Sequence, residues 1–417
     1  MRDMRDSGIA WVGSMPADWN IKRGKFTLRL LSRPVEVTDE VITCFRDGEV
    51  TLRKNRREDG FTVSLKEIGY QGIEPGDLVV HGMDGFAGSI GISDSRGKSS
   101  PVLVVCDSDE NKKYIMYYLR SMAYNDVFTA LATGIRVRSC DLRWNKIAEL
   151  PYILPDIAEQ DIIVKAIENK SAKVQALIAN VQEQIEKLKA YKQSLIIEVV
   201  TRGLDPSVPM KDSGVEWIGE IPDHWEIAKL RTRTQMLTPM RDKPEDLSGP
   251  IPWVRIEDYC GKYIANSKEH LGVTLETVKA MNLKIYPVGT VLCTSSCDLG
   301  KCAIVATELV SNQRFIGIIP TPHLSSDFLY YLMLSNAERL NTLSTGSIQA
   351  NLSRVSFEQL KVQFPPIEEQ IAIANYLDQK CEYADRLIAI KQKKIEKLNE
   401  YKKSLIYEYV TGKREVV

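Results

Sequence analysis

The chain carries the same sequence pattern twice, and a duplication restricts the possible architectures more than any local propensity. Residues 6–19 (DSGIAWVGSMPADW) return as residues 212–225 (DSGVEWIGEIPDHW), with Trp, Gly, Pro and Trp at unchanged spacing. Residues 185–201 (IEKLKAYKQSLIIEVVT) return as residues 395–411. Each half is therefore predicted to be a variable globular domain followed by a similar helix.

Capping and stop signals define the first helix. Asp156, with Glu159 three residues later, is typical of a helix start, and Gly203 followed by Pro206 is typical of a stop. Apolar residues between them recur at three- and four-residue steps, which indicates a coiled-coil seam. The seam residues are Ile185, Leu188, Leu195 and Val199 in the first copy and Ile395, Leu398 and Leu405 in the second.

Each helix is predicted to be too long to bury its apolar stripe within its own half, because about 45 residues extend about 65 Å. The two helices should therefore pack together. A domain of about 150 residues has a radius of gyration near 15 Å and cannot return the chain over that length, so the helices are expected to run antiparallel.

The globular parts are predicted to be mixed. Strands are expected at residues 76–80, 89–92 and 102–106, with a helix at 111–122. Their counterparts are strands at 289–292 and 303–305 and a helix at 326–337. The fold class is α+β, with two globular domains (1–155 and 205–365) separated by an antiparallel two-helix coiled coil (156–204 and 366–417) in a pseudo-two-fold internal repeat.

Composition limits the classes of partner. The 55 basic residues balance the 55 acidic ones, so any nucleic-acid-binding surface must be local. No apolar run approaches the roughly 20 residues that span a bilayer, and no signal peptide opens the chain, so a cytoplasmic protein without membrane contact is expected. Cys293, Cys297 and Cys302 lack paired CxxC spacing and a nearby His, and no metal site is expected.

The duplicated helix starts carry a family resemblance. The motif Pro-x-x-x-Glu-Gln occurs at residues 155–160 and 365–370, and Trp-x-Gly-x-x-Pro-x-x-Trp occurs at 11–19 and 217–225. Twice in this order, over the whole chain, they resemble the specificity subunit of type I restriction-modification enzymes.

The resemblance implies that each globular domain reads one half of a bipartite site in double-stranded DNA. It also implies that the helices dock two methyltransferase subunits, which restriction subunits join. S-adenosylmethionine, ATP and Mg²⁺ are then expected on those partners, with no cofactor and no catalytic residue in this chain.

Basic segments supply the DNA-contact candidates of domain one, because Arg can bind phosphate or bridge guanine O6 and N7. The alternative is that such charge runs are solvated loops. The candidates are Arg53, Lys54, Arg56, Arg57, Arg96, Lys98, Arg136 and Arg138.

Polar loops supply the candidates of domain two, since Gln and Asn suit adenine N6 and N7. Turn formation is the alternative role for these residue types. The candidates are Arg255, Ser295, Ser296, Lys301, Asn312, Gln313, Arg314, Gln349 and Asn351.

The repeated Trp pairs are expected to pack at the junction between domain and helix, and the Tyr pairs 117–118 and 330–331 are expected to pack in the core. Their spacing is constant while the domains diverge, which favours a structural role over base stacking.

Enzyme signatures are incomplete. Residues 91–99 have five residues between glycines where a P-loop has four, and residues 82–88 lack the dinucleotide-binding spacing. Adenine methyltransferases carry an Asn/Asp-Pro-Pro-aromatic loop, and none is present. His81 and Asp84 have no third group for acid–base chemistry. The remaining alternative is a coiled-coil scaffold without DNA specificity.

Overall fold

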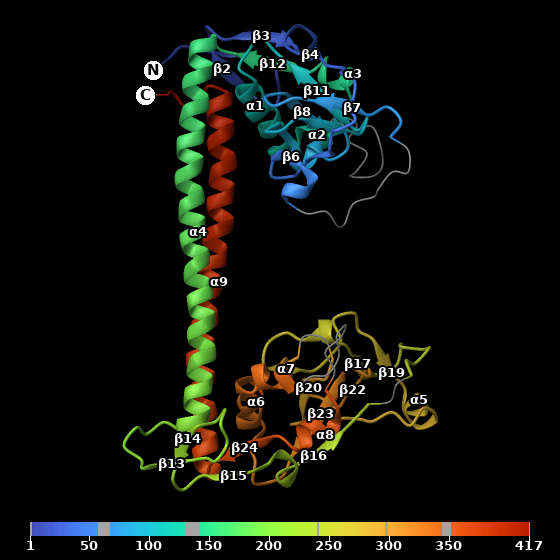
Figure 1. Cartoon of the computed structure of the whole chain (residues 1–417), viewed down its shortest axis with the longest axis vertical. Coiled ribbons are helices and arrows are strands. Elements are labelled where there is room, and N and C mark those ends of the chain that lie inside the picture. The colour runs from blue at the N-terminus through green and yellow to red at the C-terminus, as the bar shows by residue number, and fades with distance from the viewer. Residues whose placement is uncertain are drawn as a thin grey trace. The chain divides into compact units, whose positions relative to one another are not determined.

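The computed structural model describes residues 2–56, 67–130, 142–239, 242–296, 299–343 and 352–416 (Figure 1). It divides into two compact units. The first contains Met1–Gln182 and Gln392–Val417, and the second contains Glu183–Lys391. Each unit mixes helices with small sheets, as expected for the α+β class.

A four-stranded antiparallel sheet organises the first unit, in the order β4-β11-β8-β9. The bounds are Arg29–Leu30 for β4, Leu103–Asp107 for β11, Leu78–His81 for β8 and Ile90–Ile92 for β9. Helix α1 (Lys112–Tyr124) packs on the sheet through a face that includes the buried Tyr114 and Tyr118. The predicted strands at 76–80, 89–92 and 102–106 and the helix at 111–122 are thereby confirmed.

Short ladders surround that sheet. They are β1 (Met4–Asp6) with β2 (Ser14–Pro16), β3 (Asn20–Arg23) with β12 (Pro151–Leu154), β5 (Ile42–Cys44) with β6 (Val50–Leu52), and β7 (Gln71–Ile73) with β10 (Gly97–Ser99). Helices α2 (Val127–Ala130) and α3 (Trp144–Ile147) complete the described part of this globular region.

The second unit has a five-stranded sheet in the order β16-β23-β20-β21-β18. The bounds are Thr234–Leu237, Phe315–Pro320, Val291–Thr294, Cys302–Val305 and Tyr263–Ile264, in that order. Its first four strands follow the order and antiparallel pairing of the sheet in the first unit. The predicted strands at 289–292 and 303–305 are confirmed.

The rest of this unit comprises a second sheet, short ladders and helices. The second sheet has the order β19-β17-β22, with bounds Gly272–Val273, Ile251–Val254 and Val310–Ser311. The ladders are β13 (Met210–Asp212) with β14 (Glu220–Pro222) and β15 (Glu226–Lys229) with β24 (Lys361–Phe364). The short helices are α5 (Leu275–Ala280), α6 (Ser326–Ser335), α7 (Ala337–Leu343) and α8 (Arg354–Glu358).

The helix expected at 326–337 ends two residues earlier. Asn336 is the C-cap of α6, and its Nδ2 donates to the carbonyl oxygen of Leu332 at 2.8 Å. This side chain takes the place of a continuing backbone hydrogen bond, so a new helix, α7, begins at Ala337.

Two long helices account for the repeated segments: α4 covers Ile157–Arg202 and α9 covers Ile367–Val410. The Asp156 carboxylate caps α4 by accepting from the Glu159 amide at 2.8 Å, as the capping signal predicts. In the second unit, Lys192 pairs with Asp385 at 2.7 Å, and Lys391 donates to the Gln184 side chain at 2.5 Å. Gln184 precedes Lys192 along α4, whereas its partner Lys391 follows Asp385 along α9, so these parts of the two helices run in opposite directions.

The predicted seam is only partly the buried face of the helices. Ile185, Val199 and Leu405 are buried, whereas Leu188, Leu195, Ile395 and Leu398 are half-buried. Other apolar residues of the repeated segment are equally buried because they pack onto the globular part of their own unit, namely Ile196 and Val200 in the second unit and Ile406 and Val410 in the first.

Trp19 and Trp225 lie where each long helix starts, as predicted for the junction between domain and helix. Both side chains are buried. Trp19 Nε1 donates to Glu159 Oε2 at 3.0 Å, and Trp225 Nε1 donates to Glu369 Oε2 at 2.9 Å. The Glu of the motif thus holds the second Trp of the repeated segment within its own unit.

The other Trp of each pair differs between the units. Trp11 packs against Tyr118, with ring centroids 5.4 Å apart. Trp217 is 45% exposed, and the Arg339 guanidinium lies 4.2 Å from the centre of its ring. Trp217 therefore lies at the predicted junction, in a pocket that Ile197 and Thr201 of α4 also line, but it is only partly covered there. Tyr118 and Tyr331 are buried, as predicted, and Tyr117 and Tyr330 are half-buried against the core.

The glutamine after each of these glutamates fastens a second helix. Gln160 Oε1 accepts from the Asn111 amide at 2.9 Å, and Gln370 Oε1 accepts from the Ser325 amide at 2.8 Å. Asn111 and Ser325 are the N-cap residues of α1 and α6. The repeated motif therefore locks the domain helix of each unit to the start of its long helix.

Among the described residues, no helix combines the length and apolar character needed to cross a membrane.

Candidate nucleic-acid interface

The central strand of the first sheet ends at a junction of three segments. Strand β8 ends at His81, and the Gly82 amide then donates to the Val102 carbonyl oxygen at 2.8 Å. The Gly82 carbonyl oxygen accepts from the Leu142 amide at 2.8 Å. The turn after β8, the start of β11 and the chain that enters α3 are therefore fixed together at one edge of the sheet.

The second unit repeats this junction with different residues. The Ser295 amide donates to the Arg314 carbonyl oxygen at 2.8 Å, and the Ser295 carbonyl oxygen accepts from the Leu352 amide at 2.8 Å. Ser295 directly follows β20, as Gly82 follows β8. Two backbone hydrogen bonds at this edge thus recur in both units, while the side chains differ.

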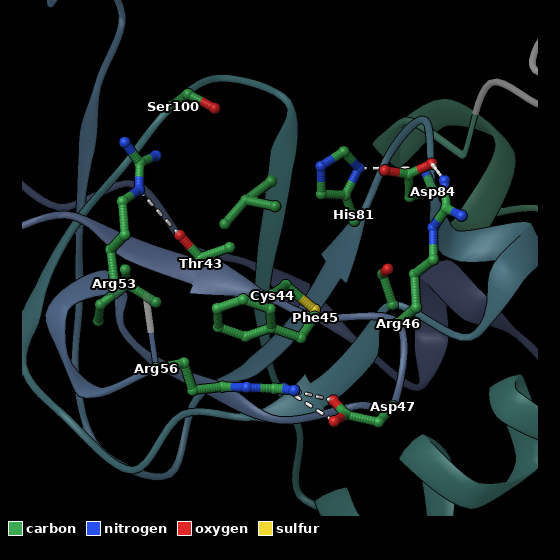
Figure 2. Close-up of a pocket in the computed structure, with 13 residues that line it drawn as sticks. Thr43, Cys44, Phe45, Arg46, Asp47, Arg53, Arg56, His81, Asp84 and Ser100 are labelled. Atoms are coloured by element: carbon green, nitrogen blue, oxygen red, sulfur yellow. Dashed lines mark hydrogen bonds and ion pairs between the residues drawn. The ribbon is translucent and has the colours of Figure 1, made fainter. Parts of the chain in front are cut away.

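A cavity of about 850 Å³ opens at this edge in the first unit; we call it cavity A (Figure 2). Its walls come from β5 and the turn after it, the segment around β6, and the ends of β8 and β11. The lining residues are Ile42, Thr43, Cys44, Phe45, Arg46, Asp47, Arg53, Arg56, His81, Asp84, Ser89, Ser100 and Leu103. The predicted residues Arg53 and Arg56 are among them.

The arginines of cavity A are held in place by their neighbours. Arg56 lies over the Phe45 ring, 4.1 Å from its centre, and pairs with Asp47 at 2.8 Å. Arg53 Nε donates to Thr43 Oγ1 at 3.3 Å. Figure 2 shows Arg56 along one wall and Arg53 on the side near Ser100. A guanidinium whose orientation is fixed in advance loses less entropy when it binds a base or a phosphate.

His81 faces the same cavity with a defined tautomer. Its Nδ1 accepts from the amides of Asp84 at 3.0 Å and Met83 at 3.3 Å. Burial lowers the pKa of His81 below its ordinary value, which the Asp84 carboxylate opposes and the Arg46 guanidinium assists. The ring is therefore neutral near pH 7 and carries its proton on Nε2.

Cys44 offers no nucleophile in cavity A. Burial raises the pKa of its thiol to about 12, so the group is protonated at neutral pH. The arrangement of cavity A suits binding through hydrogen-bond donors better than covalent chemistry.

A cavity of about 560 Å³ occupies the equivalent edge of the second unit; we call it cavity B. Four predicted residues line it: Ser295, Ser296, Gln313 and Arg314. Asn312, also predicted, shapes the turn by accepting from the Arg314 amide at 3.1 Å. The Gln313 and Arg314 side chains are exposed, and Arg354, which the sequence did not suggest, lies beside them.

Other predicted contact residues lie outside both cavities. Arg96 pairs with Glu36 at 2.7 Å and Asp39 at 3.1 Å and also contacts Glu74. Three carboxylates around one guanidinium indicate a cross-link within the domain. Further ion pairs are Lys54 with Glu40, Lys98 with Glu67 and Arg255 with Glu269. Lys301 is exposed and lines neither cavity.

Several predicted positions lie outside the described residues. They are Arg57, Arg136, Arg138, Gln349 and Asn351, together with Cys297. The segments 131–141 and 344–351 end immediately before Leu142 and Leu352, which anchor the chain at the edges of cavities A and B.

Cys293, Cys302 and Gly91 have packing roles in the described part of the chain. Cys293 and Cys302 are free, buried thiols on neighbouring strands, and no cluster of His, Cys, Asp and Glu among the described residues could hold a metal ion. Gly91, the first glycine of the segment resembling a phosphate loop, lies in β9, where a Cβ atom would stand 2.0 Å from the Gly48 carbonyl oxygen. Close backbone approach accounts for this glycine.

Sequence comparisons agree with this geometry. The type I restriction modification DNA specificity domain matches residues 226–400. The MjaIX type I restriction enzyme specificity subunit of Methanocaldococcus jannaschii is 34% identical over 185 residues, which cover 43% of this chain and 42% of that subunit. The putative MjaX specificity subunit of the same organism is 22% identical over 441 aligned residues, covering 97% of this chain and 96% of the relative.

Solved structures show the same fold. One solved structure is described as the structural basis of complex assembly and conformational transition of the type I R-M system. It has a TM-score of 0.70 and 14% sequence identity, and the match covers 96% of this chain and 99% of the chain in that structure. The HsdS subunit from Thermoanaerobacter tengcongensis has a TM-score of 0.53 and 14% identity, covering 96% and 98%.

Proposed function

Because residues 226–400 match the type I restriction modification DNA specificity domain and type I specificity subunits align with nearly the whole chain, we propose that the chain reads a bipartite DNA site for a restriction-modification complex. The observation that carries this proposal is the repeated sheet edge. Both units present a cavity at the end of the same strand, with the same backbone junction and different polar side chains. Two DNA-binding domains with different side chains would recognise a split DNA site whose two halves differ in sequence.

The side chains of each cavity can make base and phosphate contacts. Arg46, Arg53 and Arg56 line cavity A, and guanidinium groups bind guanine edges and phosphates. Gln313 and Ser296 line cavity B, where amide and hydroxyl groups can both donate and accept. Arg136, Arg138, Gln349 and Asn351, which lie outside the described residues, are proposed as further DNA contacts of the two domains.

The finer organisation that we propose is a pseudo-two-fold repeat with two target-recognition domains, residues 1–155 and 205–365. Helical segments 156–204 and 366–417 would form an antiparallel coiled coil that spaces the half-sites. Support comes from the opposed pairs of α4 and α9 and from the repeated Trp–Glu and Gln contacts. The spacer segments are proposed to dock two methyltransferase subunits, which restriction subunits join.

The chain itself is proposed to be non-catalytic, with S-adenosylmethionine, ATP and Mg²⁺ bound by the partner subunits. Its balanced charge of 55 basic and 55 acidic residues suggests that the partners supply much of the phosphate binding. Family membership favours this function over a scaffold without DNA specificity.

Selection from random duplexes tests the proposal. The chain would be purified with the subunits that accompany it, and the bound DNA would be sequenced. The expected result is one split motif with two constant half-sites and a fixed gap. A complex that assembles but enriches no sequence would support the scaffold instead.

A further inference from the structure

His81 is the side chain of cavity A whose hydrogen-bonding direction is most tightly fixed. Two backbone amides, of Met83 and Asp84, point at Nδ1 and require it to be an acceptor. The remaining ring nitrogen, Nε2, therefore carries the proton. It has no partner among the described residues, and Figure 2 shows it turned away from Asp84 toward the side of the cavity where Arg53 and Ser100 lie.

The other groups of cavity A also favour a ligand that accepts hydrogen bonds. Its lining includes the three arginines but only two carboxylates, Asp47 and Asp84. Both carboxylates are already paired, Asp47 with Arg56 at 2.8 Å and Asp84 with Arg46 at 3.1 Å. With His81 neutral, the lining carries one excess positive charge.

Ser89 also lines cavity A, but its side chain is only 1% exposed, and its Oγ is buried without a hydrogen-bond partner among the described residues. A buried hydroxyl without a partner costs about 1–3 kcal/mol, and a ligand in the cavity could recover this cost only if the Oγ atom became accessible.

The hydrogen-bonding groups of the bases restrict which base can pair with the Nε2 donor. In the major groove, guanine presents two acceptors, O6 and N7, whereas adenine places a donor, its N6 amino group, where guanine has O6. Cytosine also presents a donor there. At the O6 position, a fixed Nε2–H meets an acceptor on guanine and a second donor on adenine, which favours guanine there. Adenine N7 and thymine O4 are also acceptors, so the preference depends on the ring facing the O6 position.

We propose that His81 is a specificity-determining residue of the first unit, which donates through Nε2 to O6 of a guanine in the half-site that cavity A reads. This inference rests on the proposed function and adds to it a residue and a base. The neighbouring arginines contribute to the same acceptor edge or to the adjoining phosphate.

Two variants separate the donor of His81 from its structural hydrogen bonds. His81→Asn can keep an acceptor near the position of Nδ1 but has no atom that reaches the position of Nε2. His81→Gln can place an amide donor near Nε2. The exposed His323, whose ring has no contact with either cavity, provides the control variant His323→Asn.

The measurement is a ratio of affinities. The purified complex of chain and partner subunits binds duplexes that carry its selected split motif, and each base pair of one half-site is changed in turn, G·C to A·T and A·T to G·C. The wild-type complex is expected to prefer guanine by about tenfold or more at one position, the effect of one good base contact. In His81→Asn that ratio falls to near one, while His81→Gln and His323→Asn retain it.

The outcomes distinguish the inference from its premise. If His81→Asn keeps the wild-type ratio at every guanine, or relaxes a position that is not guanine, the role of His81 is overturned. Because the readout is a ratio, a general loss of affinity does not imitate the expected result. If the wild-type complex selects no split motif, the proposed function fails instead.

Discussion

Gln370→Leu is expected to destabilise the second unit strongly although it preserves volume and removes no charge. The Gln370 side chain is buried, and its Nε2 donates to the Pro365 carbonyl oxygen at 2.8 Å and to the His323 carbonyl oxygen at 3.1 Å. Its Oε1 accepts from the Ser325 amide at 2.8 Å. Leucine leaves all three backbone groups without this partner.

The magnitude follows from which of these groups water can reach. His323 is exposed, so its carbonyl can be solvated, whereas Pro365 is buried and Ser325 is half-buried. Two groups that lose their partners at about 1–3 kcal/mol each, partly offset by added apolar burial, predict a loss of about 2–4 kcal/mol in the free energy of unfolding. For a unit of this size that is a fall of roughly 5–15 °C in Tm.

Hydrogen exchange by mass spectrometry can assign that loss to one unit. Peptides from α6 and the start of α9 should lose protection in Gln370→Leu, while those of α1 keep it. Gln379→Leu, at an exposed position of the same helix, is the control and should change stability by no more than about 0.5 kcal/mol. If both variants exchange alike, the reasoning about the buried amide is refuted.

Three further predictions follow from other contacts. Replacing Gln313 and Arg314 together with Ala should relax base preference in one half-site by about tenfold or more and leave the other unchanged, as base-swap binding assays would show; relaxation in both halves would contradict separate readers. Acidification below pH 6.5 should lower the free energy of unfolding of the first unit, because His81 binds a proton more readily in the unfolded chain than in the folded one. This loss should stop once the pH falls below the lowered pKa of folded His81. Urea titrations of His81→Asn at several pH values should show a smaller pH dependence than those of the wild type. Lys262→Met should cost the second unit about 1–2 kcal/mol, since Lys262 pairs with Asp378 at 2.7 Å, contacts Asp327 and lies 5.2 Å from the centre of the Tyr331 ring. Thermal unfolding of this variant would be compared with that of Lys279→Met, at an exposed position of α5.

The regular elements could be predicted because their signals are local. Strand β11 is a continuous apolar run from Leu103 to Cys106, and α4 has a cap, a repeat and a stop within one stretch of chain. The short ladders β5–β6, β7–β10 and β17–β19–β22 escaped prediction because strands of two to four residues carry little pattern of their own. Their pairing depends on neighbours that the sequence does not identify.

The candidate site could be predicted only in part, because charge alone does not show a side chain's partner. Arg53 and Arg96 look equivalent in the sequence, yet Arg53 lines cavity A and Arg96 is enclosed by three carboxylates from two other segments. In the sequence, His81 suggests only an incomplete acid–base pair with Asp84. Its fixed tautomer depends on the turn that directs two amides at Nδ1, and nothing in the residue types specifies that turn.

The central claim is that this chain selects the DNA sequence on which its partners act. A genome-wide map of N6-methyladenine in the source cell, with and without this gene, tests it most directly. Loss of methylation at one split, asymmetric motif is the predicted result, and it would reveal both half-sites together. Methylation of that kind persisting unchanged without the gene would contradict the claim.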